Sequence, residues 1–290
     1  MFALQLALSG LAQGAIYALV ALSLCVVYRS TTVVNFGHGD LVMAGAFVVY
    51  VMVVLAGLPF LASAFAAVVL LFILGLCIEV GLIERIKAGP HIGFALMCIG
   101  FGYVLRGIAR AGWGREVLPM PRVLDFLPLL MGDLVVTGDS LVIFAVVAVL
   151  LGAFFLLFYR SSAGRVMQAV CQSERGAGLV GINVRAFHGV MWGAGAALGA
   201  AGGVLVAPIT LLHPNLGAIF LIKGFAAMTL GGFGSFGGAV AGGLILGVAE
   251  QLVGGYVSTK MIDITAYLVI ILVLALRPNG LFGRAIAERV

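Results

Sequence analysis

Long apolar stretches without charge constrain this chain more than any other feature. No charged residue occurs between Asp40 and Glu79, and the residues between them are nearly all aliphatic or aromatic. A helix that spans a membrane needs about 20 such residues. Charged residues make up 9% of the whole sequence, whereas an ordinary soluble domain has about 25%. The sequence therefore predicts an all-α, polytopic integral membrane protein.

Several segments are long and apolar enough to be spanning helices. Gly57-Leu58-Pro59 divides the longest stretch in two, because proline interrupts a helix and glycine favours a turn. The predicted spans are 6–28, 39–56, 60–83, 92–112, 139–159, 186–206, 216–231, 236–256 and 262–276. Segment 216–231 is short enough to be a half-helix. We therefore expect eight or nine spans, some of them broken or half-length, in a single transmembrane domain over residues 1–290.

The connections between spans predict the orientation, because cytoplasmic loops of membrane proteins are enriched in Lys and Arg. Grouping alternate connections places ten basic residues on one side: Arg29, Arg85, Lys87, Arg160, Arg165, Arg175, Arg185, Arg277, Arg284 and Arg289. Five fall on the other side: Arg106, Arg110, Arg115, Arg122 and Lys260. We therefore expect loop 160–185 and the C-terminus in the cytoplasm, and the N-terminus and loop 113–138 outside. The first 28 residues contain no Lys or Arg, which argues against a cleavable signal peptide.

Other function classes lack their usual signals. The net charge of +5 fits the basic bias of a membrane protein, so we expect no nucleic-acid partner. The four cysteines show no C-x-x-C spacing and the histidines no H-E-x-x-H motif, so neither a disulfide framework nor a metal site is predicted. No G-x-x-x-x-G-K-[ST] motif occurs, so the chain is not expected to bind ATP in the P-loop manner or to be an enzyme.

Glycines recur at four-residue spacing in several predicted spans, at 10/14, 195/199/203, 238/242 and 243/247. Such stripes let helix backbones approach closely in lipid. Two interpretations stay open: packing within this chain, or an interface with another subunit.

The loop "CQSERGAGLVGINVRAF" (171–187) looks soluble within an otherwise apolar chain. Ser173 can cap the start of a short helix and Gly181 can end it. Only about two turns lie between them, too few for a helix that is stable alone. Leu179 and Val180 are apolar although the loop is predicted to face the cytoplasm. The segment is either a connecting helix on the membrane surface or a docking helix that a cytoplasmic partner grips.

Two glycine-rich turns, "NFGHGD" (35–40) and "GGFGSFGG" (231–238), interrupt the apolar pattern in the two halves of the chain. Paired interruptions of this kind indicate the pathway of a transporter. The predicted path or gate residues are Asn35, Phe36, Gly37, His38, Gly39, Gly232, Phe233, Gly234 and Ser235. The alternative, slightly favoured by the predicted orientation, is that both turns only end helices at the cytoplasmic surface, with Asn35 and Asp40 capping the next helix.

Four motifs in order carry a family resemblance: Asn35–Asp40, Gly181-Ile182-Asn183, the stretch 222–250 and "RPNGLFG" (277–283). Together they resemble the permeases of branched-chain amino acid ABC importers, the LivH type, over nearly the whole chain. The resemblance implies a multi-pass protein of the bacterial inner membrane that works with a second permease, two cytoplasmic ATPases and a periplasmic solute-binding protein. It also implies that the 171–187 loop couples to the ATPase, through Ser173, Glu174, Arg175, Ala177, Leu179, Gly181, Ile182 and Asn183.

The same resemblance sets expectations for the energy source and the solute. ATP and Mg²⁺ are expected on the partner ATPases and no cofactor on this chain, and the second permease is expected to be a longer sister subunit. The solute is expected to be a branched-chain or other hydrophobic amino acid. Because the family includes importers of urea, amides and aromatic acids, those solutes stay open. An ion-coupled secondary transporter and a purely structural membrane subunit are the alternatives from other classes.

Overall fold

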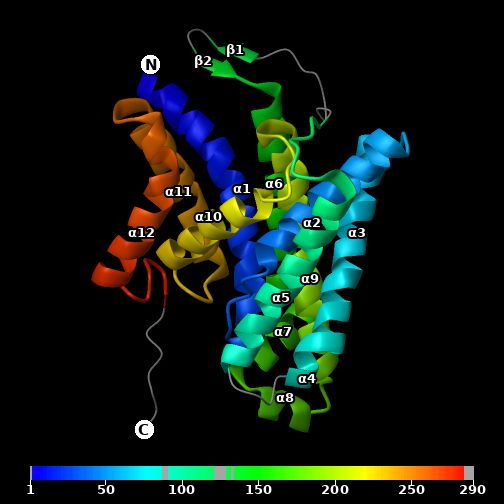
Figure 1. Cartoon of the computed structure of the whole chain (residues 1–290). Helices are drawn as coiled ribbons and strands as arrows, with labels where there is room; N and C mark the ends of the chain where they lie inside the picture. The colour runs from blue at the N-terminus through cyan, green and yellow to red at the C-terminus, as the bar shows by residue number, and fades with distance from the viewer. Residues whose placement is uncertain (1, 87–90, 121–128, 132–133, 284–290) are drawn as a thin grey trace.

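The computed structural model describes residues 2–86, 91–120, 129–131 and 134–283, and most of them are helical (Figure 1). The helices of the first half are α1 (Phe2–Thr31), α2 (His38–Tyr50) with η1 (Val51–Leu55), α3 (Phe60–Ile78) with η2 (Glu79–Ile83) and α4 (Glu84–Ile86), α5 (His91–Trp113) and α6 (Gly138–Arg160). Those of the second half are α7 (Ser162–Gln172), α8 (Glu174–Leu179), α9 (Val184–Thr210), α10 (Leu216–Gly231), α11 (Phe236–Tyr256), η3 (Thr259–Met261) and α12 (Ile262–Leu276).

Eight of the described helices are long and apolar enough to cross a membrane, and α10 is a shorter apolar helix. This confirms the prediction of an all-α polytopic protein with eight or nine spans, one of them short. The break at Gly57-Leu58-Pro59 is also confirmed, since Gly57 has φ +66° and α3 begins directly after Pro59. Helix α1 is longer at both ends than the predicted span 6–28.

Helix α1 forms the centre of the bundle and is the most buried of the long helices. It packs along α11 through the predicted glycine stripes. A Cβ atom on Gly14 would lie 2.9 Å from the carbonyl oxygen of Gly243, and one on Gly10 would lie 2.9 Å from that of Gly247. These glycines therefore pack helices within this chain.

The bundle has two distinct ends in Figure 1. At one end, which we call the hairpin end, the start of α1 lies near a hairpin of β1 (Leu129–Met131) and β2 (Leu134–Val136). Gln5 holds this hairpin, because its side chain donates to and accepts from the backbone of Val135 at 2.8 and 3.0 Å. Helices α4 and α8 lie at the opposite end, which we call the α8 end. Residues 121–128 and 132–133 of the predicted loop 113–138 lie outside the described residues.

Helix α7 lies within residues 160–185, which the sequence predicts to be a loop. Ser161 caps it, with its hydroxyl accepting from Gly164 N at 3.0 Å, and Met167 and Val170 face inward. An apolar pattern at 163, 166, 167 and 170 is visible in the sequence and is typical of an amphipathic helix. Cys171, in the last turn, donates to the carbonyl oxygen of Arg29 at the end of α1 at 3.6 Å.

Candidate functional site

Two helices begin inside the bundle instead of at its ends. Figure 1 shows α2 and α10 starting near the centre of the molecule. The two starts touch, because a Cβ atom on Gly39 would overlap the carbonyl oxygen of Gly217, and one on Gly217 would overlap that of Gly39. Irregular backbone at such a depth is tolerated where protein or a water-filled cavity satisfies it. We call this contact the half-helix junction.

Two arginines of α5, one turn apart, hold the two sides of the junction. Arg106 donates two hydrogen bonds to the carboxylate of Asp40, from Nε at 3.0 Å and from Nη2 at 3.1 Å. Arg110 Nη2 donates to Asn215 Oδ1, just before α10, at 2.8 Å. The Asp40 carboxylate also lies in the first turn of α2, where the helix dipole favours a negative charge. Helix α5 therefore ties both half-helix starts in place.

The 35–40 turn is buried, and the expectation that it ends helices at the cytoplasmic surface is wrong. His38 Nε2 lies 2.7 Å from Ser23 Oγ, so α2 begins beside α1, more than a turn before the end of that helix. Asn35 Oδ1 accepts from Gly37 N at 2.9 Å, and the residue before α2 is Gly37, without a side-chain cap. Asn35 and Asp40 therefore do not cap α2, because their side chains bond Gly37 N and Arg106. Phe36 is the exposed member of the turn.

Three buried nitrogen atoms near this turn have no hydrogen-bond partner among the described residues: Asn35 Nδ2, His38 Nδ1 and Trp192 Nε1. Trp192, on α9, packs against Phe94 and Phe101 of α5, with ring centroids 6.1 and 6.5 Å apart. Leaving a buried polar group unpaired costs about 1–3 kcal/mol, so such groups mark places to examine for function. Sequence reasoning missed Trp192, although a tryptophan in a helix of glycine and alanine is a visible signal.

The 231–238 turn lies at the junction of α10 and α11 and does end helices. Gly232 and Gly234 have φ +106° and +78°. Ser235 Oγ caps α11 by accepting from Gly238 N at 3.1 Å. Phe233 lies edge-on to the Tyr28 ring at 5.3 Å, near the end of α1. The structure thus brings the 35–40 turn to the start of α10, and the 231–238 turn forms the end of that helix.

The short helix predicted between Ser173 and Gly181 is present as α8. Ser173 Oγ accepts from Gly176 N at 3.0 Å, and Gly181 has φ +85°. The backbone N–H of Ile182 donates to the carbonyl oxygen of Ala177 at 3.0 Å, as in a Schellman motif. Asn183 caps the following helix, α9, by accepting from Ala186 N at 3.0 Å. Both predicted capping roles, of Ser173 and Gly181, are confirmed.

Helix α8 presents an apolar edge to the outside. Leu179 is 89% exposed and Val180 77% exposed, whereas Ala177 is 4% exposed and faces the protein. Glu174 lies 3.3 Å from the buried His188 Nε2 of α9, which fixes one side of the helix to the bundle. The backbone of the loop is therefore well supported, and its most exposed large side chains are apolar.

A buried ionic group joins α1, α10 and α11. Lys223 Nζ donates to Glu250 Oε2 at 3.1 Å and to Tyr17 Oη at 3.0 Å, and Tyr17 Oη donates to Glu250 Oε2 at 2.7 Å. The opposite charges of Lys223 and Glu250 thus compensate each other inside the apolar bundle. This group stabilises the packing of the three helices, because removing one partner would leave a buried charge unpaired.

Comparison with known proteins gives a consistent result. The model of the family described as "Branched-chain amino acid transport system / permease component" matches residues 6–274. The high-affinity branched-chain amino acid transport system permease protein BraD of Pseudomonas aeruginosa is 29% identical, over 99% of this chain and 98% of its own length. LivH of Escherichia coli K12, a protein of the same description, is 29% identical over 100% of this chain and 98% of its own.

A more distant sequence relative and one solved structure extend the comparison. The probable branched-chain amino acid transport permease protein LivH of Methanocaldococcus jannaschii is 26% identical over 91% of this chain and 88% of its own. The structure of PsaBC from Streptococcus pneumoniae in complex with Fab has a similar fold, with a TM-score of 0.51 and 14% identity over 93% of this chain and 91% of that one.

Proposed function

Because the chain belongs to the family of branched-chain amino acid transport system permease components, we propose that it is the transmembrane permease subunit of an ABC importer for branched-chain or other hydrophobic amino acids. The observation that carries this conclusion is the family match over residues 6–274, together with eight helices of spanning length. The chain is a multi-pass protein of the inner membrane. These relatives do not favour urea, amides or aromatic acids as the solute, and they do not favour ion-coupled transport.

The energy for transport comes from partners in this proposal. Two cytoplasmic subunits bind ATP and Mg²⁺ and hydrolyse ATP, and this chain has no ATPase site and no cofactor of its own. A periplasmic binding protein delivers the solute. The second permease is a longer sister subunit, so that the membrane part is a heterodimer.

Helix α8 is the part of this chain that the ATPase contacts. Leu179 and Val180 are exposed apolar side chains on a supported helix, and such side chains call for a partner that covers them. Ser173, Gly181 and Asn183 shape the loop, Ala177 and Ile182 seat it against the protein, and Glu174 and Arg175 flank the contact. Leu179→Asp would place a charge in this contact and should abolish ATP-driven uptake while membrane insertion persists. Unchanged uptake by this variant would exclude the docking role.

The proposed orientation places the α8 end in the cytoplasm and the hairpin end in the periplasm. The basic residues counted for it include Lys87, Arg122, Arg284 and Arg289, which lie outside the described residues. Single cysteines at Val117 and Arg165, in a background without the native cysteines, should react from opposite sides of the membrane. Reaction of Arg165→Cys with an impermeant reagent in intact cells would reverse the orientation.

The solute path or gate runs beside the 35–40 turn in this proposal. Its support is the half-helix junction and the unpaired nitrogen atoms of Asn35, His38 and Trp192. Phe36 is the side chain of this turn that a reagent can reach. A bulky thiol reagent on Phe36→Cys should stop uptake, and the same reagent on Gly237→Cys, an exposed position in α11, should not. Full uptake by the modified Phe36→Cys complex would exclude the proposal that this turn lines the solute path.

A direct experiment tests the proposed function as a whole. Cells with and without the gene are given radiolabelled leucine, urea, acetamide or phenylacetate, and uptake is compared after ATP is depleted while the proton gradient is kept. The proposal expects leucine uptake that depends on the gene and stops with ATP depletion, and co-purification of the permease with an ATPase. Uptake that follows the proton gradient would indicate a secondary transporter, and unchanged uptake of every solute a structural subunit.

A further inference from the structure

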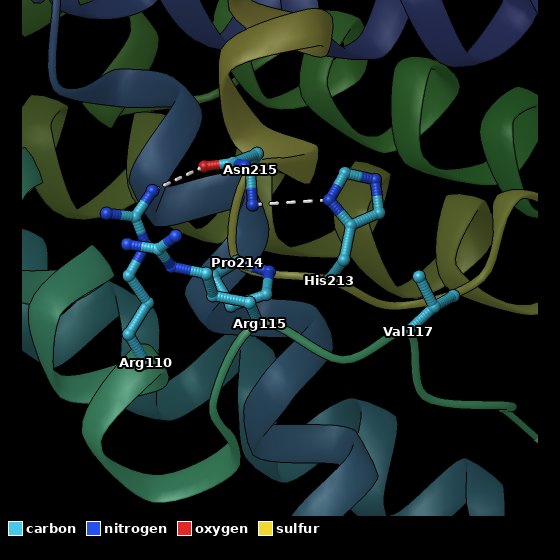
Figure 2. Close-up of a pocket in the computed structure, with 6 residues that line it drawn as sticks. All are labelled: Arg110, Arg115, Val117, His213, Pro214 and Asn215. Carbon is cyan, nitrogen blue, oxygen red and sulfur yellow. Dashed lines mark hydrogen bonds between the residues drawn. The ribbon is translucent and has the colours of Figure 1, made fainter.

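A small pocket lies at the start of α10, where the segment that follows α5 meets the segment that precedes α10. Its volume is about 200 Å³, and Figure 2 shows the residues that line it. It is lined by Arg110, Arg115, Val117, His213, Pro214 and Asn215. A short backbone pairing holds its two walls together, because Leu118 and Leu212 exchange hydrogen bonds at 2.8 and 3.0 Å. The pocket is therefore built between two connected segments and not on a single loose loop.

The lining of this pocket is basic. In Figure 2 the side chains of Arg110 and Arg115 lie on one side, and those of His213 and Val117 lie on the other. Within the described ranges, none of the ion pairs involves either guanidinium. Glu116 follows Arg115 in sequence but is not among the lining residues. Among the described residues, the pocket therefore has two fixed positive charges and no lining carboxylate.

The contrast between the two arginines of α5 shows what the pocket lacks. Arg106, one turn deeper, has a carboxylate partner in Asp40, with two hydrogen bonds. Arg110 instead donates to a neutral amide oxygen, that of Asn215. A guanidinium binds a carboxylate more strongly than an amide, with two parallel hydrogen bonds. Arg110 and Arg115 together are thus suited to a carboxylate that comes from outside the chain.

We infer that this pocket binds the carboxylate of the transported amino acid at the mouth of the permease. The inference rests on the proposed function and narrows its solute class to molecules with a free carboxylate, and so away from urea and amides. Val117 and Pro214 supply an apolar wall beside the two charges, as a solute with an aliphatic side chain requires. Because Arg110 also bonds Asn215, directly before α10, the bound carboxylate contacts the residues that hold the half-helix junction.

The test uses Val117→Cys in a background without the native cysteines, in the complete transporter in nanodiscs without ATP. The rate of reaction with a charged maleimide is measured with isovalerate, isovaleramide, L-leucine or sulfate present. Isovalerate and isovaleramide differ in the carboxylate alone. We expect isovalerate and leucine to slow labelling severalfold and isovaleramide to leave it unchanged. Equal protection by isovaleramide, or protection by sulfate equal to that by leucine, would overturn the inference.

Variants then assign the effect to the arginines. Arg110→Gln and, separately, Arg115→Gln should raise the half-protecting leucine concentration by about tenfold or more, as loss of a hydrogen bond to a charged group implies. Arg110→Lys should recover part of the loss. Lys260→Gln removes a positive charge from another exposed position and should change little. An equal shift in Lys260→Gln, or no shift in both arginine variants, would contradict the inference.

Protection of Val117→Cys and leucine uptake, measured on the same transporter, distinguish failure of this inference from failure of the proposed function. An acidic side chain of the binding protein is the other source of a carboxylate. Protection of Val117→Cys by ligand-free binding protein, without protection by leucine, would assign the arginines to that contact and overturn the inference. Normal leucine uptake without protection would exclude carboxylate binding in the pocket and leave the proposed function standing. Protection without any amino acid uptake would support carboxylate binding in the pocket and exclude the proposed function.

Discussion

The glycine-rich turn at residues 35–40 lies inside the helix bundle, whereas the turn at residues 231–238 closes the end of α10. Gly37 of the first turn and Gly234 of the second serve different needs. Gly37 has φ −84°, which any residue can adopt, but a Cβ atom there would overlap the carbonyl oxygen of Cys98. Gly234 has φ +78°, and a Cβ atom there would meet nothing within 4 Å. Gly37 is thus needed for close approach, and Gly234 for its backbone conformation.

This difference changes what a substitution can report. A tryptophan at Gly37 would be a natural choice to block a path, but it would disrupt the contact with α5 and therefore the fold. Side chains that reach outward, such as Phe36, are better probes of the path at this turn. The four substitutions below test the comparison, from the largest expected effect to the smallest.

Gly39→Val should have the largest effect. Its side chain would overlap the backbone of Gly217, and neither helix start can move without breaking the half-helix junction. We expect a loss of at least about 3 kcal/mol in the free energy of unfolding, at the upper end for overpacked sites. Thermal unfolding in detergent measures it. Gly100→Val, where a Cβ atom meets nothing within 4 Å, is the control. Equal unfolding temperatures for the two variants would show that the junction is not tightly packed.

Asp40→Asn should come next, because it leaves the charge of Arg106 without its carboxylate. The pair is mostly buried, with side-chain exposures of 18% for Arg106 and 6% for Asp40, so we expect a loss of about 2–3 kcal/mol. Asp263→Asn is the matched control, because Asp263 is 83% exposed and lies 3.5 Å from Lys223. A loss no greater than that of the control would contradict a role of Asp40 in holding α2.

Gly234→Ala should have a smaller effect, which comes from the backbone. A residue with a Cβ atom in the left-handed region costs about 1–2 kcal/mol. Gly237→Ala, three residues later in the first turn of α11, should be neutral or slightly stabilising, because alanine favours a helix. The difference in unfolding temperature between the two variants measures the cost of the positive φ. No difference would mean that the turn adapts its backbone.

Ser235→Ala should have the smallest effect. It removes the hydrogen bond that the Ser235 hydroxyl accepts from Gly238 N at the start of α11. Loss of a helix cap in a partly exposed position costs about 0.5–1 kcal/mol. Ser235→Asp should retain the stability, since Asp also caps helices. If both variants lose the same free energy of unfolding, the hydroxyl has a role other than capping. The 231–238 turn would then resemble the 35–40 turn, whose polar side chains do not cap a helix.

Features that depend on neighbours in sequence could be predicted from the sequence alone. The spanning segments follow from runs of apolar residues, and the break at residues 57–59 follows from glycine and proline. The start and end of α8 follow from Ser173 and Gly181, because caps act within a few residues. The family could also be identified from motifs in order along the chain. Helix α7 shared this kind of local signal, and the apolar spacing would have shown it.

Only the tertiary structure decided which distant residues meet. Asp40 and Arg106 are 66 residues apart, and Arg110 and Asn215 are 105 apart, so no local pattern pairs them. The same holds for Tyr17 and Glu250, which are 233 residues apart. The burial of the 35–40 turn also depends on α5, α9 and α10, which pack around it. A buried glycine-rich turn and an exposed one have the same local sequence pattern, so the sequence does not distinguish them. The apolar pattern therefore specifies the helices, and the packing of their backbones places the charges and the two half-helix starts.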